Sequence, residues 1–165
     1  MSTKSIMPKK DWIYRFTCNI VFEQGDLFLV ADINGGGGQS PALWVLSTEN
    51  RLINGNMKWE IWSHPLEQST IVVLWNRPSG RYIMSVGDKE KIETSHGDEN
   101  EVKFHWYLEG ADVKNPDNRI PVKFRSVLYP SLFLDLEVNN PVDGTPFVCW
   151  RSHNGPTQRF NLHVL

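Results

Sequence analysis

The chain has 165 residues, of which 40% are hydrophobic, and a formal net charge of −2. A chain of this length can bury roughly 70% of its unfolded surface in one core, so we expect a single domain. Acidic and basic residues are interspersed, which excludes the basic patch of a nucleic-acid-binding protein. No stretch approaches the ~20 apolar residues of a membrane span, so no membrane insertion is expected.

The first ten residues are polar and contain lysines with no apolar segment behind them. We expect residues 1–10 to form a flexible tail and residues 11–165 to form the domain. Because a secretory signal needs an apolar core, we expect a cytoplasmic protein that would leave the cell only by a non-classical route. Cys18 and Cys149 lie in separate strand-like runs and are predicted to be buried thiols rather than a disulfide.

Short strand-like runs, separated by turn residues, follow one another along the rest of the chain. Three predicted hairpins cover residues 12–33, 70–86 and 121–138. Each hairpin is followed by one more strand, a loop and a closing strand, which makes about twelve strands. Gly and Pro interrupt every stretch with helical spacing of apolar residues, so the chain is predicted to be all-β.

The last third of the chain repeats the first third. Residues 27–29 and 132–134 both read Leu-Phe-Leu, and further matches keep the same offset as far as Ser47 and Ser152. A weaker middle copy lies between them. Each of the three copies ends with an aromatic residue followed by a variable residue and an aliphatic residue. This periodicity predicts three units of about fifty residues, approximately 11–66, 67–116 and 117–165, whose closing aromatics are Trp59, Trp106 and Phe160.

Three such units must bury their faces on one another, because a single hairpin is marginally stable in water. Closure into a barrel with threefold symmetry would also remove most exposed sheet edges. We therefore predict that Trp59, Trp106 and Phe160 occupy equivalent positions in one core.

The third unit resembles the ricin-B-type β-trefoil lectins, which include fungal proteins and parts of bacterial toxins. The resemblance rests on Leu134-Asp135-Leu136, on the turn at residues 143–146, on Trp150 and on Gln158-Arg159-Phe160. These match the aspartate strand, the Asp-Gly-Thr-Pro turn, the aromatic residue and the terminal Gln-x-Trp of that family, with Phe160 replacing the tryptophan. The resemblance implies a β-trefoil fold in which each unit can carry a shallow sugar site.

Carried over residue by residue, the resemblance implies that Asp135 accepts hydrogen bonds from two sugar hydroxyls and that Trp150 stacks on the apolar sugar face. Hydrogen bonds to a carboxylate are strong, and a rigid ring adds contact area at low entropic cost. Gln158 would orient Asp135 or reach the sugar. The family usually has Asn immediately before this Gln, whereas this chain has Thr157. Two nearby residues are candidates to replace that Asn, namely His153 and Asn154.

The first two units lack this set of residues. Val30 and Met84 are aligned with Asp135, and Met57 and Phe104 are aligned with Gln158, so the family-type site is predicted to be lost there. A plain glycine-rich loop is the simplest interpretation of the glycines in the first unit. A secondary site in another geometry would use Asp32, Asn34, Gly36, Gly37 and Trp44. In the second unit, the charged run at residues 88–91 is interpreted as a solvated loop.

Catalytic chemistry is not indicated. The five histidines lack metal-ligand spacing, residues 35–38 are not followed by Gly-Lys-Ser/Thr, and no Gly-x-Ser-x-Gly elbow is present. Cys149 and His153 could form a nucleophile and a base, but Cys149 should point opposite to Trp150, into the core. The prediction is a binding protein that is not an enzyme and uses no cofactor or metal.

The resemblance implies a lectin for galactose or N-acetylgalactosamine-type glycans, acting mainly through the third unit, with a defence role as in fungal members. One shallow site binds weakly, so avidity for glycoproteins or glycolipids would need a homodimer or several sites. A different class remains open, that of β-trefoil protease inhibitors, which would act here through the exposed loops at residues 48–56 and 109–118. A third alternative is an interaction module that has lost all ligands.

Overall fold

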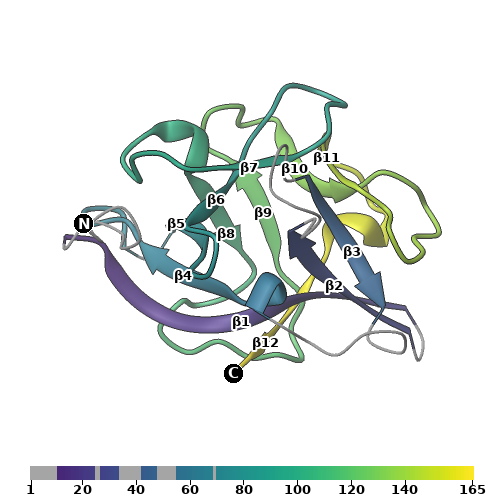
Figure 1. The fold of residues 1–165 in the computed structure, drawn as a ribbon, viewed down its shortest axis with the longest axis horizontal. Helices are drawn as coiled ribbons and strands as arrows, with labels where there is room; N and C mark the ends of the chain where they lie inside the picture. The colour runs from purple at the N-terminus through teal and green to yellow at the C-terminus, as the bar shows by residue number, and fades with distance from the viewer. Residues whose placement is uncertain (1–10, 25–26, 34–41, 48–54, 69) are drawn as a thin grey trace.

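A computed structural model describes residues 11–24, 27–33, 42–47, 55–68 and 70–165. Within these residues no helix is long and apolar enough to cross a membrane. The all-β prediction and the number of strands are confirmed, because twelve strands join in one sheet and the helices are single 3-10 turns. The strands (Figure 1) are β1 (Ile13–Gln24), β2 (Leu27–Ile33), β3 (Leu43–Ser47), β4 (Trp59–Ser63), β5 (Ile71–Asn76), β6 (Arg81–Met84), β7 (Glu93–Ser95), β8 (Trp106–Glu109), β9 (Lys123–Ser126), β10 (Leu132–Leu136), β11 (Phe147–Arg151) and β12 (Asn161–Val164). The 3-10 helices are η2 (Gly55–Met57), η3 (Val102–Phe104) and η4 (Pro156–Gln158).

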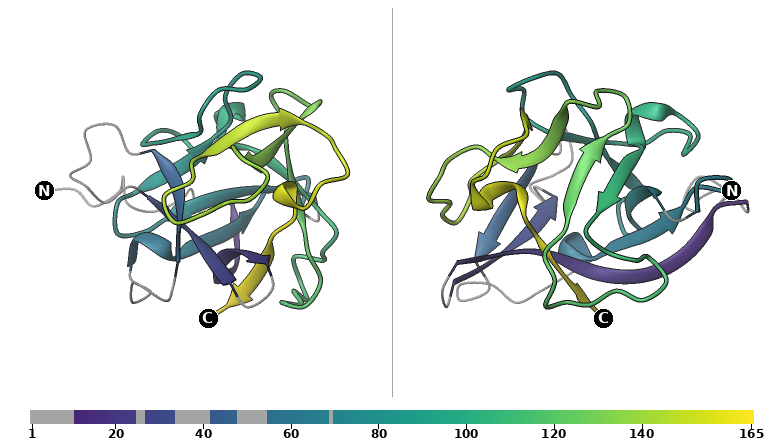
Figure 2. Two further views of the ribbon diagram at one scale, coloured as in Figure 1. Left: turned by 90° about the vertical axis from the view of Figure 1, so that its right-hand side faces the viewer. Right: turned by 180° about the vertical axis from the view of Figure 1, so that it is seen from behind.

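Six strands form the barrel. β1 pairs with β4, β4 with β5, β5 with β8, and β8 with β9, all antiparallel. An isolated bridge between Val122 and Phe160 and the pairing of β12 with β1 close the ring. Figures 1 and 2 show β12 lying beside β1, so strands from the two ends of the chain meet in one barrel. Closure satisfies the backbone groups that an open sheet would leave at its edges.

Three hairpin extensions cover one end of this barrel. The pairs β2–β3, β6–β7 and β10–β11 each follow a barrel strand of their own unit. Bridges between Ala42 and Glu93, between Trp44 and Pro146, and between Lys91 and Val148 link the three hairpins to one another. A six-stranded barrel capped by three linked hairpins is a β-trefoil, and the predicted fold is confirmed.

The closing aromatics lie in the core, as predicted. Trp59, Trp106 and Phe160 have no exposed surface. The indole N–H of Trp59 donates to the Ala31 carbonyl at 3.2 Å, and that of Trp106 donates to the Ile83 carbonyl at 3.1 Å. Each tryptophan therefore fills the core and also satisfies a buried carbonyl of its own unit.

The two cysteines are free and fully buried, which confirms the prediction of thiols rather than a disulfide. Burial disfavours the thiolate and raises the pKa of Cys149 to about 11. The pKa of Cys18 is raised for the same reason.

The Asp-Gly-Thr-Pro turn connects the third unit to the first. Gly144 adopts φ +88°, a backbone conformation that residues other than glycine rarely adopt. The Gly144 N–H donates to the Val45 carbonyl at 2.7 Å, and the Val45 N–H donates to the Thr145 carbonyl at 3.0 Å. An oxygen of Asp143 accepts a hydrogen bond from the Ser47 N–H at 2.7 Å. The motif that carries part of the family resemblance therefore holds two hairpins of the cap together.

Candidate functional site

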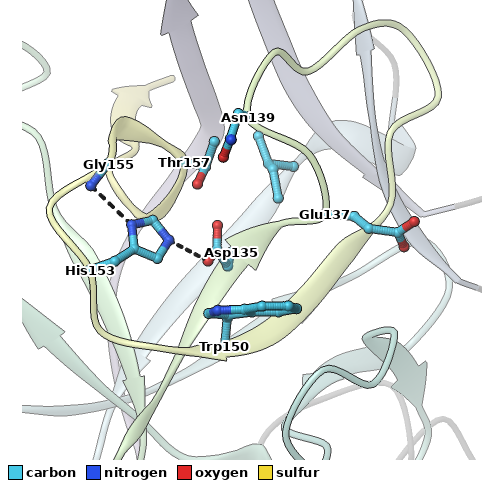
Figure 3. Close-up of a pocket in the computed structure, with 8 residues that line it drawn as sticks. Asp135, Glu137, Asn139, Trp150, His153, Gly155 and Thr157 are labelled. Carbon is cyan, nitrogen blue, oxygen red and sulfur yellow. Dashed lines mark hydrogen bonds and ion pairs between the residues drawn. The ribbon is translucent and has the colours of Figure 1, made fainter.

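A hollow of about 170 Å³ opens at the surface of the third unit (Figure 3). Strands β10 and β11, the loop between them and the segment around η4 all contribute to its wall. Figure 3 shows the Trp150 ring on one side of the hollow, Asn139 and Thr157 on the opposite side, and Asp135 with His153 between them. The residues that line it are Asp135, Leu136, Glu137, Asn139, Trp150, His153, Gly155 and Thr157.

Asp135 is the central polar group of the hollow. Its side chain is only 4% exposed, and both of its hydrogen bonds reach the same oxygen, Oδ2. His153 Nε2 lies 2.8 Å from this oxygen, and Gln158 Nε2 lies 3.1 Å from it. The other oxygen, Oδ1, is buried and has no hydrogen-bond partner in the described part of the chain. An unpaired carboxylate oxygen in this position is costly, so it favours a donor supplied from outside the chain.

His153 is held in one tautomer. Its Nδ1 accepts a hydrogen bond from the Gly155 backbone N–H at 2.9 Å, so the ring proton must be on Nε2, which donates to Asp135. In this arrangement the imidazole is neutral and orients the carboxylate without neutralising it. His153 was one of two candidates to replace the missing Asn, and the structure places it at Asp135.

Gln158 lies behind the hollow rather than in its wall. Pro156 begins η4, where its missing N–H costs no helical hydrogen bond, and the turn directs Gln158 inward. The Gln158 side chain is fully buried, and its amide donates to Asp135 and, at 2.7 Å, to the Arg151 carbonyl. Of its two predicted roles, orienting Asp135 or reaching a ligand, the geometry assigns it the first.

Trp150 contributes an exposed aromatic ring to the hollow. It is 37% exposed and pairs with Phe133 across the β10–β11 ladder. Lys89 Nζ lies 5.3 Å from the centroid of the indole ring, within the range of a cation–π contact. Lys89 is not among the residues that line the hollow, whereas Trp150 is.

Five residues of the wall were not among the predicted site residues, namely Leu136, Glu137, Asn139, Gly155 and Thr157, and two predicted residues, Gln158 and Asn154, do not line the hollow. Glu137, Asn139 and Thr157 line the hollow, whereas Asn154 is exposed and does not. Asn139 matches Asn34 in the repeat, and Thr157 occupies the position of the family Asn, so the sequence pattern could have indicated both as site residues. No sequence pattern indicated Glu137, because it follows the strand in a loop whose course the pattern does not specify.

The charged run of the second unit is more than a solvated loop. Its side chains are exposed, but the Lys89 N–H donates to the Cys149 carbonyl at 2.8 Å and the Cys149 N–H donates to the Glu90 carbonyl at 3.1 Å. Lys91 lies 4.0 Å from Glu137 at the hollow. The run is a loop with solvent-exposed side chains, as interpreted, and its backbone in addition pairs with β11 of the third unit.

Apolar clusters fill the corresponding places in the first two units. Met57 and Phe104 end η2 and η3 as Gln158 ends η4, each two residues before a core aromatic. Met57 belongs to a cluster with Val30. Phe104 stacks on Tyr82 with ring centroids 4.8 Å apart. Tyr82, and not Met84, therefore occupies the position equivalent to Asp135 and packs on Phe104. The sequence alignment of the middle unit was wrong by two residues at this point.

The proposed secondary site lies partly outside the described residues, since Asn34, Gly36 and Gly37 are not among them. Of its two described members, Asp32 is buried and accepts a hydrogen bond from the Trp44 indole N–H at 3.1 Å. This pair links β2 to β3.

A nucleophile–base pair of Cys149 and His153 is not assembled. Cys149 is buried on the core face of β11 and its thiol pKa is raised, whereas His153 Nε2 is bound to Asp135. What the hollow provides instead is a hydrogen-bond acceptor beside an aromatic surface. Such a set can hydrogen-bond a polar group of a ligand and pack against its apolar face.

Comparison with known proteins supports the fold. Neither a protein-family model nor a curated protein matches the sequence. Solved structures do match. The agglutinin of Rhizoctonia solani is 17% identical with a TM-score of 0.69, covering 92% of this chain and 96% of its own. The ricin B-like lectin of Macrolepiota procera, in complex with lactose, is 16% identical with a TM-score of 0.64, covering 90% and 95%. The C-terminal half of an earthworm R-type lectin, in complex with GalNAc, is 18% identical with a TM-score of 0.62, covering 91% and 99%. At these identities the likeness shows a β-trefoil like that of the ricin-B-type lectins.

Proposed function

We propose that the protein binds carbohydrate through the Asp135 hollow of its third unit. One observation carries the proposal, namely that Asp135 Oδ1 is buried without a partner in the described chain while the exposed Trp150 ring lines the same hollow. A sugar matches both features, since a hydroxyl donates to the carboxylate and the C–H face lies on the ring. Oδ2 already accepts two hydrogen bonds from within the chain. The main contact with a sugar hydroxyl therefore falls to Oδ1, and the two oxygens do not each accept from one of a pair of hydroxyls.

Galactose and N-acetylgalactosamine-type glycans are the proposed ligands. This choice rests on the resemblance of the third unit to the ricin-B-type lectins, and on two structural neighbours that contain lactose and GalNAc. The proposed partners are therefore glycoproteins or glycolipids that display such glycans.

A glycan array tests the proposal. The native protein should bind a galactose-type subset, and Asp135→Ala should lower affinity about tenfold to a hundredfold, the value of one hydrogen bond to a charged group. Asp112→Ala, which removes an exposed aspartate that does not line the hollow, is the matched control, and circular dichroism verifies that all three proteins are folded. Binding that survives in Asp135→Ala would move the site elsewhere. Silence from the native protein would refute the proposal and turn attention to protease inhibition.

Location and assembly complete the proposal. We propose a cytoplasmic protein with a role in defence, whose single site gains avidity by homodimerisation. Fractionation of the source cells tests the location. Light scattering of the purified protein tests the dimer, and a monomer at all concentrations would leave the weak single site as the whole binding capacity.

A further inference from the structure

A titratable side chain, that of His153, contacts the central carboxylate of the hollow. Figure 3 shows the ring between Asp135 and Gly155, with a hydrogen bond to each. The His153 side chain is 34% exposed, so protons from solvent can reach the ring. Histidine is the side chain whose charge normally changes between about pH 5 and 8. The function proposed above uses the orientation of this ring but not its titration.

Both ring nitrogens of His153 are occupied in the neutral form. Nε2 donates to Asp135 at 2.8 Å, and Nδ1 accepts from the Gly155 N–H at 2.9 Å. A second proton on the ring would convert Nδ1 into a donor, and it would then face another donor. The backbone at Gly155 lies so close that an added Cβ atom would be 3.0 Å from Nδ1. The charged imidazolium therefore cannot keep both of its present contacts.

The charges around His153 determine which contact is lost. The part of η4 in the wall of the hollow carries no charge. The charged groups on the other neighbouring elements are Asp135 on β10, Glu137 in the following loop with Lys91 at 4.0 Å, Arg151 on β11 with Asp88 at 3.9 Å, and Lys123 on β9, which donates to Ser152 at 3.4 Å. Asp135 is the group bonded to the ring, and its carboxylate holds an imidazolium as a charge-assisted pair. The hydrogen bond that breaks on protonation is therefore the one to Gly155.

Loss of the Gly155 hydrogen bond acts on the hollow in two ways. Gly155 and Thr157 belong to the wall, and this bond ties their segment to the ring. The imidazolium also places a positive charge next to Oδ2 of Asp135, which makes the carboxylate a weaker acceptor at its unpaired oxygen, Oδ1. A displaced wall and a weaker acceptor both disfavour a bound sugar.

We propose that His153 makes the Asp135 hollow sensitive to pH, so that the hollow binds a neutral glycan while the ring is neutral and releases it when the ring takes up a proton. His153 is a positioning residue in this role, because it acts through Asp135 and Gly155. The inference rests on the proposed function of the hollow and adds its regulation. A ligand that binds the neutral ring form displaces one proton, so the affinity falls as the pH falls.

Calorimetric titration with galactose, which has no titratable group between pH 5 and 8, measures this effect. The quantity compared is the ratio of the affinities at pH 8 and pH 5.5 within each protein, and pH 5.5 stays above the ordinary titration range of Asp and Glu. The native ratio should be about tenfold, the change expected for one displaced proton over a histidine titration. Circular dichroism at both pH values verifies that each protein is folded.

His153→Gln is the informative variant, because its amide copies the neutral ring. The amide N–H can donate to Asp135 and the amide oxygen can accept from Gly155, but the group takes up no proton in this range. Its ratio should be close to one, whatever its affinity at pH 8. His163→Gln is the matched control and should keep the native ratio. His163 is also 34% exposed, and its Nε2 also lies 2.8 Å from a carboxylate, that of Glu23, but it does not line the hollow.

Nitrogen NMR of the native protein tests the structural step without a variant and without a ligand. At pH 8 the His153 ring should carry its proton on Nε2. On acidification the Gly155 amide signal should move with the same midpoint as the protonation of the ring. A ring proton on Nδ1 at pH 8, or a Gly155 amide that does not respond to the ring, would overturn the inference.

The outcomes separate this regulation from the proposed function. Equal galactose affinity at both pH values, or a native ratio that persists in His153→Gln, would overturn the role of His153 while leaving the hollow as the binding site. A native protein that binds galactose at neither pH would refute the proposed ligand class and the regulation together.

Discussion

The first unit shows how the Asp135–Gln158 pair can be replaced, because it has Val30 and Met57 packed in one apolar cluster. Gln158→Met alone would remove two hydrogen bonds that its amide donates, leaving the Arg151 carbonyl unpaired and Asp135 with His153 as its remaining donor. Each unsatisfied buried group costs about 1–3 kcal/mol. We expect Gln158→Met to lower the free energy of unfolding by about 2–4 kcal/mol. At about 2–4 °C per kcal/mol for a chain of this size, the melting temperature should fall by roughly 5–15 °C.

The double variant Asp135→Val, Gln158→Met should be less damaged than the two single changes predict. Replacing both partners by apolar groups removes the buried charge together with its donor, which is far less costly than removing one partner. We expect a coupling free energy of about 1–3 kcal/mol in favour of the double variant. All three variants should bind glycan more weakly than the native protein.

Urea unfolding followed by circular dichroism measures this cycle. Midpoints can be compared as free energies provided that the slope with denaturant is the same in all four proteins. Effects that add within about 0.5 kcal/mol would show that Asp135 and Gln158 are not coupled, and would refute the assignment of Gln158 as the residue that orients the carboxylate. Retained glycan binding in Gln158→Met would refute it independently.

Four further outcomes follow from the structure. Trp59→Ala should cost about 3–5 kcal/mol in urea unfolding, as truncation of a buried aromatic does, and a near-neutral effect would contradict the repeat alignment. Burial lowers the pKa of His105, so the unfolded state binds more protons and the free energy of unfolding should fall as the pH drops below about 6.5. A His105→Gln variant whose stability falls just as steeply with pH would exclude this cause. Lys89→Gly should be about 1 kcal/mol more stable than Lys89→Ala in thermal melts, the reverse of the usual order, because only glycine adopts positive φ freely. Cys149 should react with a thiol reagent only at the rate of global unfolding, and rapid labelling of the native protein would contradict its burial.

Local sequence sufficed for several parts of the candidate site. Asp135, Trp150 and Gln158 were predicted from the resemblance of one short unit to the ricin-B-type lectins, and the structure brings all three to one hollow or its immediate support. The residue that replaces the family Asn was left open between His153 and Asn154. Only the path of the loop after β11 decides which of the two reaches the carboxylate, and that path depends on the Gly155 N–H bonding to the ring.

The contribution of the second unit could not be predicted from the sequence. Lys89 contacts Trp150 although 61 positions separate them, and residues 88–91 read as an ordinary charged turn. The same limitation explains the register error at Met84, since a faint repeat aligned by sequence alone cannot decide which side chain stacks on Phe104.

By itself the sequence determined the all-β class, the three units, the core aromatics and the identity of the central carboxylate. The first three follow from alternation, turn residues and repetition, which are visible along the sequence, whereas the carboxylate was assigned from the resemblance of the third unit to the ricin-B-type lectins. The tertiary structure alone decided that both hydrogen bonds to Asp135 converge on one oxygen, that Glu137 and Thr157 line the same hollow, and that a loop of the second unit supports Trp150. Those contacts depend on how hairpins from different units close over one barrel, and periodicity carries no information about which side chains meet across that closure.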